Sequence, residues 1–300
     1  MRRAVPAGER LVLDGGMGRE LKRRGVPIPK TLWSANALLV APEAVRATHA
    51  DFIRAGADVI IANNYPVVPS ILEKAGIGER LEELLRLAGK LAVEAREESG
   101  RAALVAGSLS PLMGRPEDVP LETLAGIYGR IAQTMAPYVD LFVGETLSSA
   151  MEGRAAALGA ASAGKPVWIA WGLHDDASGR LRSGESVADA VDAVADLDVE
   201  AILFNCCTPE SIDAVLPQLR SKTDRLVGAY ANAFKPTPEE WTRHEVTYDM
   251  REDMEPETYA GFARRWLGTG MRLIGGCCGM GPEHIARLRE LVPQAKGIPG

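Results

Sequence analysis

The chain has 300 residues, of which 34 are Lys or Arg and 40 are Asp or Glu, so its formal net charge is −6. Hydrophobic residues make up 46% and charged residues 25%, the proportions of an ordinary globular protein. A chain of this length buries roughly three-quarters of its unfolded surface, so it needs no disulfide scaffold to form a core. With 31 Gly and 19 Pro it also lies outside the range of low-complexity and disordered chains.

Neither a membrane protein nor a nucleic-acid-binding protein is predicted. The longest uncharged stretch, residues 59–72, contains two Asn and two Pro, and it is shorter than the about 18 apolar residues of a membrane span. No apolar segment follows the first arginines as it would in a secretory signal. The mild acidity and the lack of a Lys/Arg run argue against nucleic acid. We therefore expect a cytoplasmic protein with small-molecule partners.

Short apolar runs, many of them β-branched, recur along the chain and predict buried strands. They are residues 11–13, 59–62, 103–106, 141–143, 167–170, 202–204, 226–227 and 273–274. Stretches with helical spacing follow these runs, at residues 42–55, 71–98, 121–138, 150–163, 186–197, 209–219, 256–267 and 282–292. Continuous apolar strands that alternate with helices are typical of a parallel sheet covered on both faces.

This alternation predicts an α/β fold, and eight strand-helix units predict a single (β/α)8 TIM barrel that spans residues 1–300. Pro42, Pro209, Pro256 and Pro282 stand where predicted helices begin, a position that tolerates the missing N–H of proline. The alternative is an open, doubly wound sheet. No linker or change of composition divides the chain, which favours one domain over two.

In a TIM barrel the functional residues lie after the strands, so each predicted strand end is a candidate for the site. Polar or thiol side chains gather there. The strand ends carry Asp14, Gly15 and Gly16; Asn63, Asn64 and Tyr65; Ser108; Glu145 and Thr146; Trp171; Asn205, Cys206 and Cys207; Tyr230, Ala231 and Asn232; and residues 275–279.

All four cysteines of the chain belong to this set, as the adjacent pairs Cys206/Cys207 and Cys277/Cys278. In an intracellular protein this spacing indicates metal binding or catalysis rather than disulfides. Neighbouring residues of an extended chain point in opposite directions, so both members of a pair reach one ion only where the backbone bends. Glycines around the second pair permit that bend, whereas only Cys206 of the first pair is expected to face the barrel mouth.

Three thiolates, from Cys206, Cys277 and Cys278, predict a Zn²⁺ site that keeps one coordination position open. Zinc stabilises a bound thiol as the thiolate, which is its nucleophilic form. The pattern therefore indicates alkyl transfer to sulfur. The alternatives are a thiol or iron–sulfur redox protein, and a barrel without catalytic activity.

Several motifs along the chain share the order and spacing of one protein family. They are Asp14-Gly15-Gly16, residues 32–34, residues 42–62, residues 144–146, Asn205-Cys206 and the Gly-Gly-Cys-Cys-Gly run at 275–279. Together they resemble the homocysteine S-methyltransferase family, whose members are zinc-dependent barrels and include S-methylmethionine and betaine homocysteine methyltransferases. The resemblance spans nearly the whole chain and implies a methyltransferase of methionine biosynthesis that uses Zn²⁺ to methylate L-homocysteine.

The resemblance also implies roles for individual residues. It makes Cys206, Cys277 and Cys278 the catalytic zinc ligands and leaves Cys207 without a role. The residues implied for substrate binding are Asp14, Gly15, Gly16, Asn64, Tyr65 and Glu145. Among them, the two carboxylates are expected to bind the substrate ammonium, and the N–H groups of the glycine turn its carboxylate.

Three loops depart from the family pattern and leave the methyl donor open. Asn64 stands where relatives usually carry Thr or Ser, the loop at 108–120 is short, and residues 231–234 replace the usual Pro-Asn followed by Gly. We expect a sulfonium donor such as S-methylmethionine, because one barrel of this length leaves no room for a cobalamin or folate domain. The alternative donors are a methyl-corrinoid and betaine. An acceptor thiol other than homocysteine is a further alternative.

Overall fold

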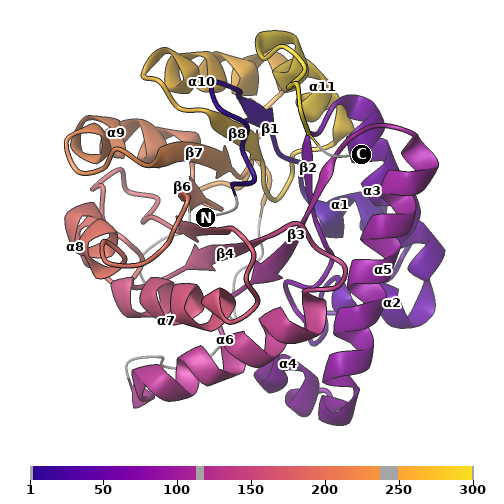
Figure 1. Cartoon of the computed structure of the whole chain (residues 1–300). Helices are drawn as coiled ribbons and strands as arrows, with labels where there is room; N and C mark the ends of the chain where they lie inside the picture. The colour runs from indigo at the N-terminus through magenta and orange to yellow at the C-terminus, as the bar shows by residue number, and fades with distance from the viewer. Residues whose placement is uncertain (1–2, 113–117, 237–248, 299–300) are drawn as a thin grey trace.

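The computed structural model describes residues 3–112, 118–236 and 249–298. Its sheet consists of eight parallel strands, arranged around a common axis in Figure 1. The strands are β1 (Leu11–Val12), β2 (Val59–Ile61), β3 (Leu104–Leu109), β4 (Leu141–Leu147), β5 (Val167–Trp171), β6 (Ala201–Asn205), β7 (Leu226–Ala231) and β8 (Leu273–Gly276). Each strand pairs with the next in the sequence from β2 to β8, and β8 pairs with β1.

The sheet closes into a barrel between β1 and β2. Leu13 and Val59 form a parallel bridge, and the N–H of Asp14 donates to the carbonyl of Val59 over 2.9 Å. Before β2, the N–H of Asp58 donates to the carbonyl of Val12 over 2.7 Å. The predicted (β/α)8 TIM barrel is therefore confirmed, and the open doubly wound sheet was wrong.

Helices cover the outside of the barrel (Figure 1). They are α1 (Met17–Arg23), α2 (Ala35–Val40), α3 (Pro42–Ala55), α4 (Pro69–Lys74), the 3₁₀ turn η1 (Gly78–Arg80), α5 (Leu81–Ser99), α6 (Leu121–Met135), α7 (Ala150–Ala161), α8 (Val187–Ala193), α9 (Pro209–Arg220), α10 (Pro256–Gly268) and α11 (Pro282–Leu291). Within the described ranges, no helix is both long enough and apolar enough to cross a membrane.

The prediction of one continuous helix over residues 71–98 was wrong, because the structure has two helices there with a turn between them. Helix α4 ends at Lys74, and Gly76 has a φ of 74°, a left-handed conformation that ends a helix and favours glycine. The chain then makes the η1 turn before α5 begins at Leu81. The short helices α1 and α2 were not predicted, because six or seven residues carry too little periodicity to be recognised.

Side chains of the strands form two apolar layers, as alternation along a strand requires. Leu141 and Val143 of β4 point into the barrel, whereas Phe142 packs in the outer layer against the helices. The same alternation in β5 sends Trp168 inward and Trp171 outward. Trp171 therefore belongs to the core between sheet and helices rather than to the barrel mouth.

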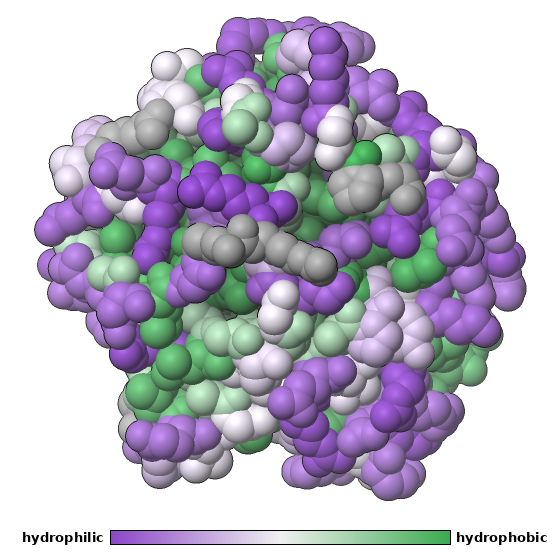
Figure 2. Space-filling view, viewed as in Figure 1, coloured by the Kyte–Doolittle hydropathy of each residue, from purple (hydrophilic) through white to green (hydrophobic). Residues whose placement is uncertain are grey.

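The N-terminal segment covers the end of the barrel at which the strands begin. In Figure 1 this indigo segment crosses the centre of the barrel, and Figure 2 shows hydrophilic residues of the surrounding helices around the rim. The buried carboxylate of Glu200 accepts the N–H groups of Ala4 and Val5, each over 3.1 Å, and the indole N–H of Trp168 over 2.8 Å. The Glu200 carboxylate, with its three N–H donors, thus fastens the N-terminal segment to this end of the barrel.

Candidate metal centre and substrate site

Three cysteine sulfurs meet at the end of the barrel where the strands finish. The Sγ atoms of Cys206, which follows β6, and of Cys277 and Cys278, which follow β8, all lie within 4.8 Å of one another. Within the described ranges this is the one group of three or more metal-ligating side chains that come so close. The spatial convergence expected from the two cysteine pairs is present in the fold.

A left-handed turn separates the two members of the first cysteine pair. Cys206 has a φ of 52°, and its N–H donates to the carbonyl of Tyr230 on β7 over 3.2 Å. Cys207 is fully buried in the apolar layer between sheet and helices, where burial raises the pKa of its thiol to about 12. The turn therefore directs one thiol to the barrel mouth and leaves the other protonated in the core.

The second cysteine pair occupies a tight turn after β8. The N–H of Cys277 donates to the carbonyl of Ala231 over 2.8 Å, and the carbonyl of Cys278 accepts the N–H of Ala233 over 2.9 Å. Gly279 follows with a φ of 89°, a conformation in which a β-carbon would be strained. Because the backbone bends here, both adjacent thiols face the same side.

The chemistry of these donors suits a thiophilic divalent cation. Zinc–sulfur bonds of about 2.3 Å in tetrahedral geometry place ligand sulfurs roughly 3.8 Å apart, which the observed limit allows. Hydrogen bonds from Cys277 and Cys278 lower the pKa of Cys206, and the same contacts with Cys206 raise the pKa of both partners. The cluster thus loses one proton readily, and further ionisation requires a nearby cation.

Glu145 lies on β4 and is only 6% exposed. Its carboxylate accepts the hydroxyl of Ser108 over 2.6 Å and the phenol of Tyr230 over 3.2 Å. Burial raises the pKa of Glu145 to about 7, although both hydroxyl donors act in the opposite direction. An arriving cation would pair with this carboxylate and favour its ionised form.

Asp14 is the second buried carboxylate at this end. It is 4% exposed and accepts the N–H of Ile61 over 2.9 Å. Burial raises the pKa of Asp14 well above its usual range, and the charge of Glu145 adds to the rise. Two buried carboxylates whose pKa values are both raised form a site with affinity for a cationic group.

The glycine turn after β1 packs directly against the turn after β8. The N–H of Gly16 donates to the carbonyl of Met280 over 2.9 Å, so this donor already has a partner within the protein. A β-carbon at Gly15 would lie 2.3 Å from that same carbonyl oxygen. These glycines therefore allow the two loops to approach closely.

Asn64 and Tyr65 follow β2 at the same end. The amide of Asn64 donates to the carbonyl of Ser108 over 2.8 Å and accepts its N–H over 3.0 Å, which fixes the residue that contacts Glu145. The ring of Tyr65 stacks on Trp33, with centroids 6.2 Å apart and an interplanar angle of 15°. Part of the neighbouring loop at 108–120, residues 113–117, lies outside the described residues.

Several residues that support the site had no predicted role. Asn205 accepts the N–H of Thr146 over 2.7 Å and donates to its hydroxyl over 2.8 Å, linking β6 to β4. Tyr259 of α10 donates to the carbonyl of Gly275 and accepts the N–H of Ala231 over 3.0 Å. Asn205 had a signal in the sequence, because it directly follows a predicted strand, whereas Tyr259 looks like any aromatic residue on a buried helix face.

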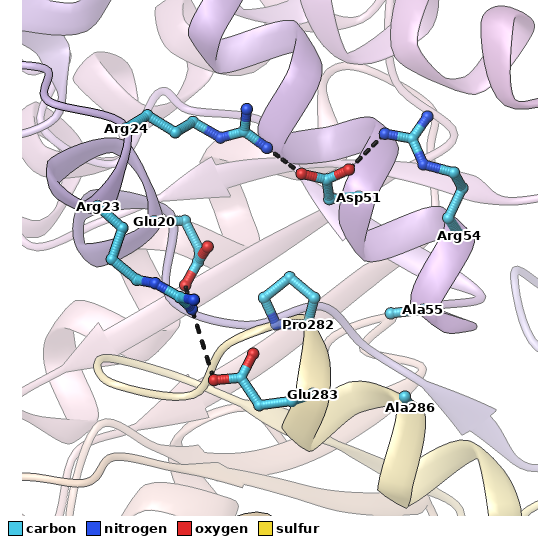
Figure 3. Close-up of a pocket in the computed structure, with 9 residues that line it drawn as sticks. All are labelled: Glu20, Arg23, Arg24, Asp51, Arg54, Ala55, Pro282, Glu283 and Ala286. Carbon is cyan, nitrogen blue, oxygen red and sulfur yellow. Dashed lines mark hydrogen bonds and ion pairs between the residues drawn. The ribbon is translucent and has the colours of Figure 1, made fainter.

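A surface groove of about 660 Å³ lies between α1, α3 and α11, outside the barrel (Figure 3). Its charged residues are already paired with one another. Asp51 bridges Arg24 and Arg54, and Arg23 pairs with Glu20 over 2.9 Å and with Glu283 over 3.5 Å. These internal ion pairs give the groove the character of a structural salt-bridge network rather than of a ligand site.

Comparison with known proteins points to one family. The family profile described as homocysteine S-methyltransferase matches residues 11–292. A relative from Zea mays named homocysteine S-methyltransferase 1 is 30% identical over 318 residues, which cover 97% of each chain. A relative from Brassica oleracea var. italica named selenocysteine Se-methyltransferase is 27% identical and covers 96% of this chain and 90% of its own.

A solved structure gives the same result. The crystal structure of the homocysteine methyltransferase MmuM from Escherichia coli, in its metallated form, superposes with a TM-score of 0.78. It is 27% identical in sequence, and the match covers 95% of this chain and 97% of that one. Sequence and architecture thus agree over nearly the full length.

Proposed function

The chain belongs to the homocysteine S-methyltransferase family, and from this premise we propose that it methylates L-homocysteine with the help of one zinc ion held by Cys206, Cys277 and Cys278. The observation that carries this proposal is the convergence of the three sulfurs within 4.8 Å at the barrel mouth. Zinc, when bound, would supply an open coordination position that favours the thiolate form of the substrate sulfur.

The substrate ammonium would bind between Asp14 and Glu145. Both carboxylates are buried beside the thiol cluster, and the charge of Cys206 affects the pKa of Glu145. Ser108 and Tyr230 hold the Glu145 carboxylate in place, so the amino acid would bind in one orientation. Asn64 would act one step further away, by fixing Ser108.

The proposed donor is a sulfonium, with S-methylmethionine as the first candidate. Its methyl–sulfur bond breaks as the substrate thiolate forms a new bond to the same carbon, and the donor leaves as a neutral thioether. The stacked rings of Trp33 and Tyr65 supply aromatic faces, which attract cationic methyl groups. No protein base is required for transfer, because loss of the thiol proton accompanies metal binding.

Metal analysis and a donor comparison test this proposal. We expect about one zinc per chain, no visible absorption of an iron–sulfur cluster, and methionine formation from homocysteine with S-methylmethionine. S-adenosylmethionine, betaine and a methyl-corrinoid protein would be assayed in parallel, with selenocysteine as an alternative acceptor because a relative carries that activity in its name. Activity with only betaine or the corrinoid protein would contradict the proposed sulfonium donor. Full activity in the metal-free enzyme would contradict the proposed zinc centre.

A further inference from the structure

Arg182, in the loop between β5 and α8, reaches across to the strand end that carries the first thiol. Its guanidinium donates to the carbonyl oxygen of Cys206. The side chain lies over Gly172, where a β-carbon would be 2.9 Å from Nε and 3.0 Å from Cζ of the arginine. The absence of a side chain at this glycine therefore opens the path by which the guanidinium reaches β6.

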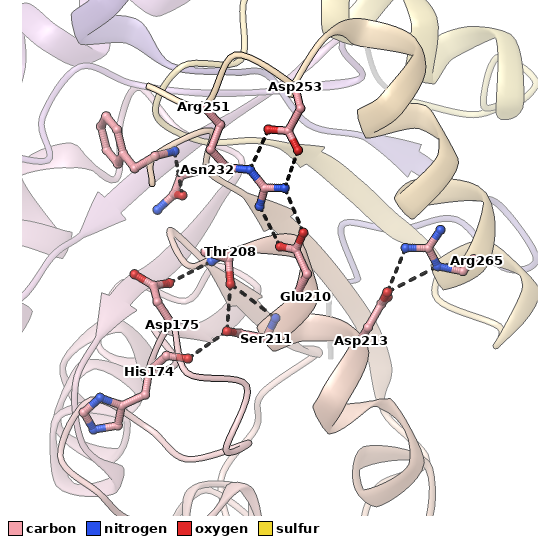
Figure 4. Close-up of polar contacts among 11 residues, drawn as sticks. His174, Asp175, Thr208, Glu210, Ser211, Asp213, Asn232, Arg251, Asp253 and Arg265 are labelled. Carbon is pink, nitrogen blue, oxygen red and sulfur yellow. Dashed lines mark hydrogen bonds and ion pairs between the residues drawn. The ribbon is translucent and has the colours of Figure 1, made fainter. Parts of the chain in front are cut away.

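The same loop also forms hydrogen bonds with the residues that follow Cys206. Asp175 accepts the N–H of Thr208 over 2.9 Å, and the hydroxyl of Ser211 donates to the carbonyl of His174 over 2.8 Å (Figure 4). These contacts fix the start of α9, and Arg182 fixes the residue two positions before Thr208. The left-handed turn at Cys206, with its φ of 52°, is thus anchored from one neighbouring loop.

The charge of Arg182 also suits this location. Three thiolates and a substrate thiolate carry more negative charge than one divalent cation neutralises. A cation that contacts the backbone of one ligand reduces this excess without occupying the coordination position of the substrate.

We propose that Arg182 is a positioning residue of the metal centre, an inference that rests on the proposed zinc site. It holds the Cys206 turn so that this thiol faces Cys277 and Cys278. Residues that hold metal ligands in place commonly contribute 10- to 100-fold to metal affinity. The loop after β5 therefore belongs to the active site although it contributes no metal ligand.

Arg182→Met removes both the donor and the charge at nearly constant side-chain length. We expect zinc affinity, measured by competition with a chelator, to fall by about 10- to 100-fold. The Co²⁺-substituted variant should show weaker thiolate charge-transfer and tetrahedral bands, because Cys206 coordinates less completely. Arg182→Lys keeps the charge but not the planar donor, so its zinc affinity should lie between that of Arg182→Met and that of the wild type.

Arg180→Met is the matched control, because Arg180 is an exposed residue of the same loop and donates to Gly184 rather than to Cys206. It should bind zinc and Co²⁺ as the wild type does. Wild-type affinity and spectra in Arg182→Met would overturn the inference. Should that variant not fold, unchanged affinity and spectra in Arg182→Lys would overturn it instead. A wild-type protein that binds no zinc would contradict the proposed function itself.

Discussion

The two ends of the barrel each bury carboxylates, but they treat them differently. Where the strands begin, Glu200 accepts three N–H groups, two from the N-terminal segment and one from Trp168. Where the strands end, Glu145 has two hydroxyl donors, and its pKa is raised to about 7 by burial. Burial also raises the pKa of Asp14, and the charge of Glu145 adds to this rise.

This difference separates stability from function. A carboxylate that accepts several N–H groups joins separate segments of the chain and helps to hold the fold together. A buried carboxylate without a cation raises the free energy of the native state until a ligand supplies the missing charge. Buried carboxylates that wait for a cationic ligand thus lower the stability of the fold at one end of the barrel. The contacts at the other end and the apolar layers offset this loss.

The largest expected effect is the loss of a thiol at the functional end. Cys277→Ala should abolish stoichiometric zinc binding and lower methyl transfer by at least about 1000-fold, because metal activation contributes several kcal/mol. Cys207→Ala is the matched control, since that thiol is buried in the core. It should keep zinc and activity. Metal analysis and methionine formation check both variants, and an active, zinc-loaded Cys277→Ala protein would contradict the proposed centre.

The next effect sharpens the role of the carboxylate at the same end. Glu145→Gln keeps the shape of the side chain but removes the charge that would pair with the substrate ammonium. We expect kcat/KM for homocysteine to fall by about 100-fold, mainly through KM, since a charge-assisted pair contributes about 2–3 kcal/mol. Steady-state kinetics would show this, whereas an unchanged KM would remove Glu145 from the substrate site.

The pH dependence of stability tests the same residue without substrate. The pKa of Glu145 is raised from 4.5 to about 7 in the native protein, so the native state holds a proton that the unfolded chain has lost between these values. Stability of the metal-free protein therefore falls as pH rises through this window, by about 2 kcal/mol between pH 5 and pH 7 from this group. Urea unfolding of Glu145→Gln should lack this contribution, and identical pH slopes would contradict it.

The smallest effect belongs to the opposite end. Glu200→Gln places an amide N–H₂ group among the N–H donors of Ala4, Val5 and Trp168. We expect the free energy of unfolding to fall by about 1.5 kcal/mol, while kcat/KM stays at the wild-type value. Denaturant unfolding and kinetics on one sample would measure both quantities. A loss of activity in the folded variant would show that the two ends are not independent.

Much of the fold could be predicted because its signals are local. Buried parallel strands are short apolar runs, and the residues after them stand next to those runs in the sequence. The cysteine pairs and their glycines are likewise local motifs, so Cys206, Cys277 and Cys278 could be singled out together. The interruption at Gly76 was missed because a single glycine within an otherwise helical pattern does not reveal its φ.

The amino-acid sequence alone determined the barrel architecture, the family and the three thiols, because periodicity and motifs are properties of neighbouring residues. Only the tertiary structure decided that Gly16 gives its N–H to Met280, that Ser108 and Tyr230 share Glu145, and that Arg182 holds Cys206. These contacts join different strands and loops, and closure of the barrel sets their distances. The position of a residue in the sequence does not indicate which residue of another strand or loop it contacts in the closed barrel.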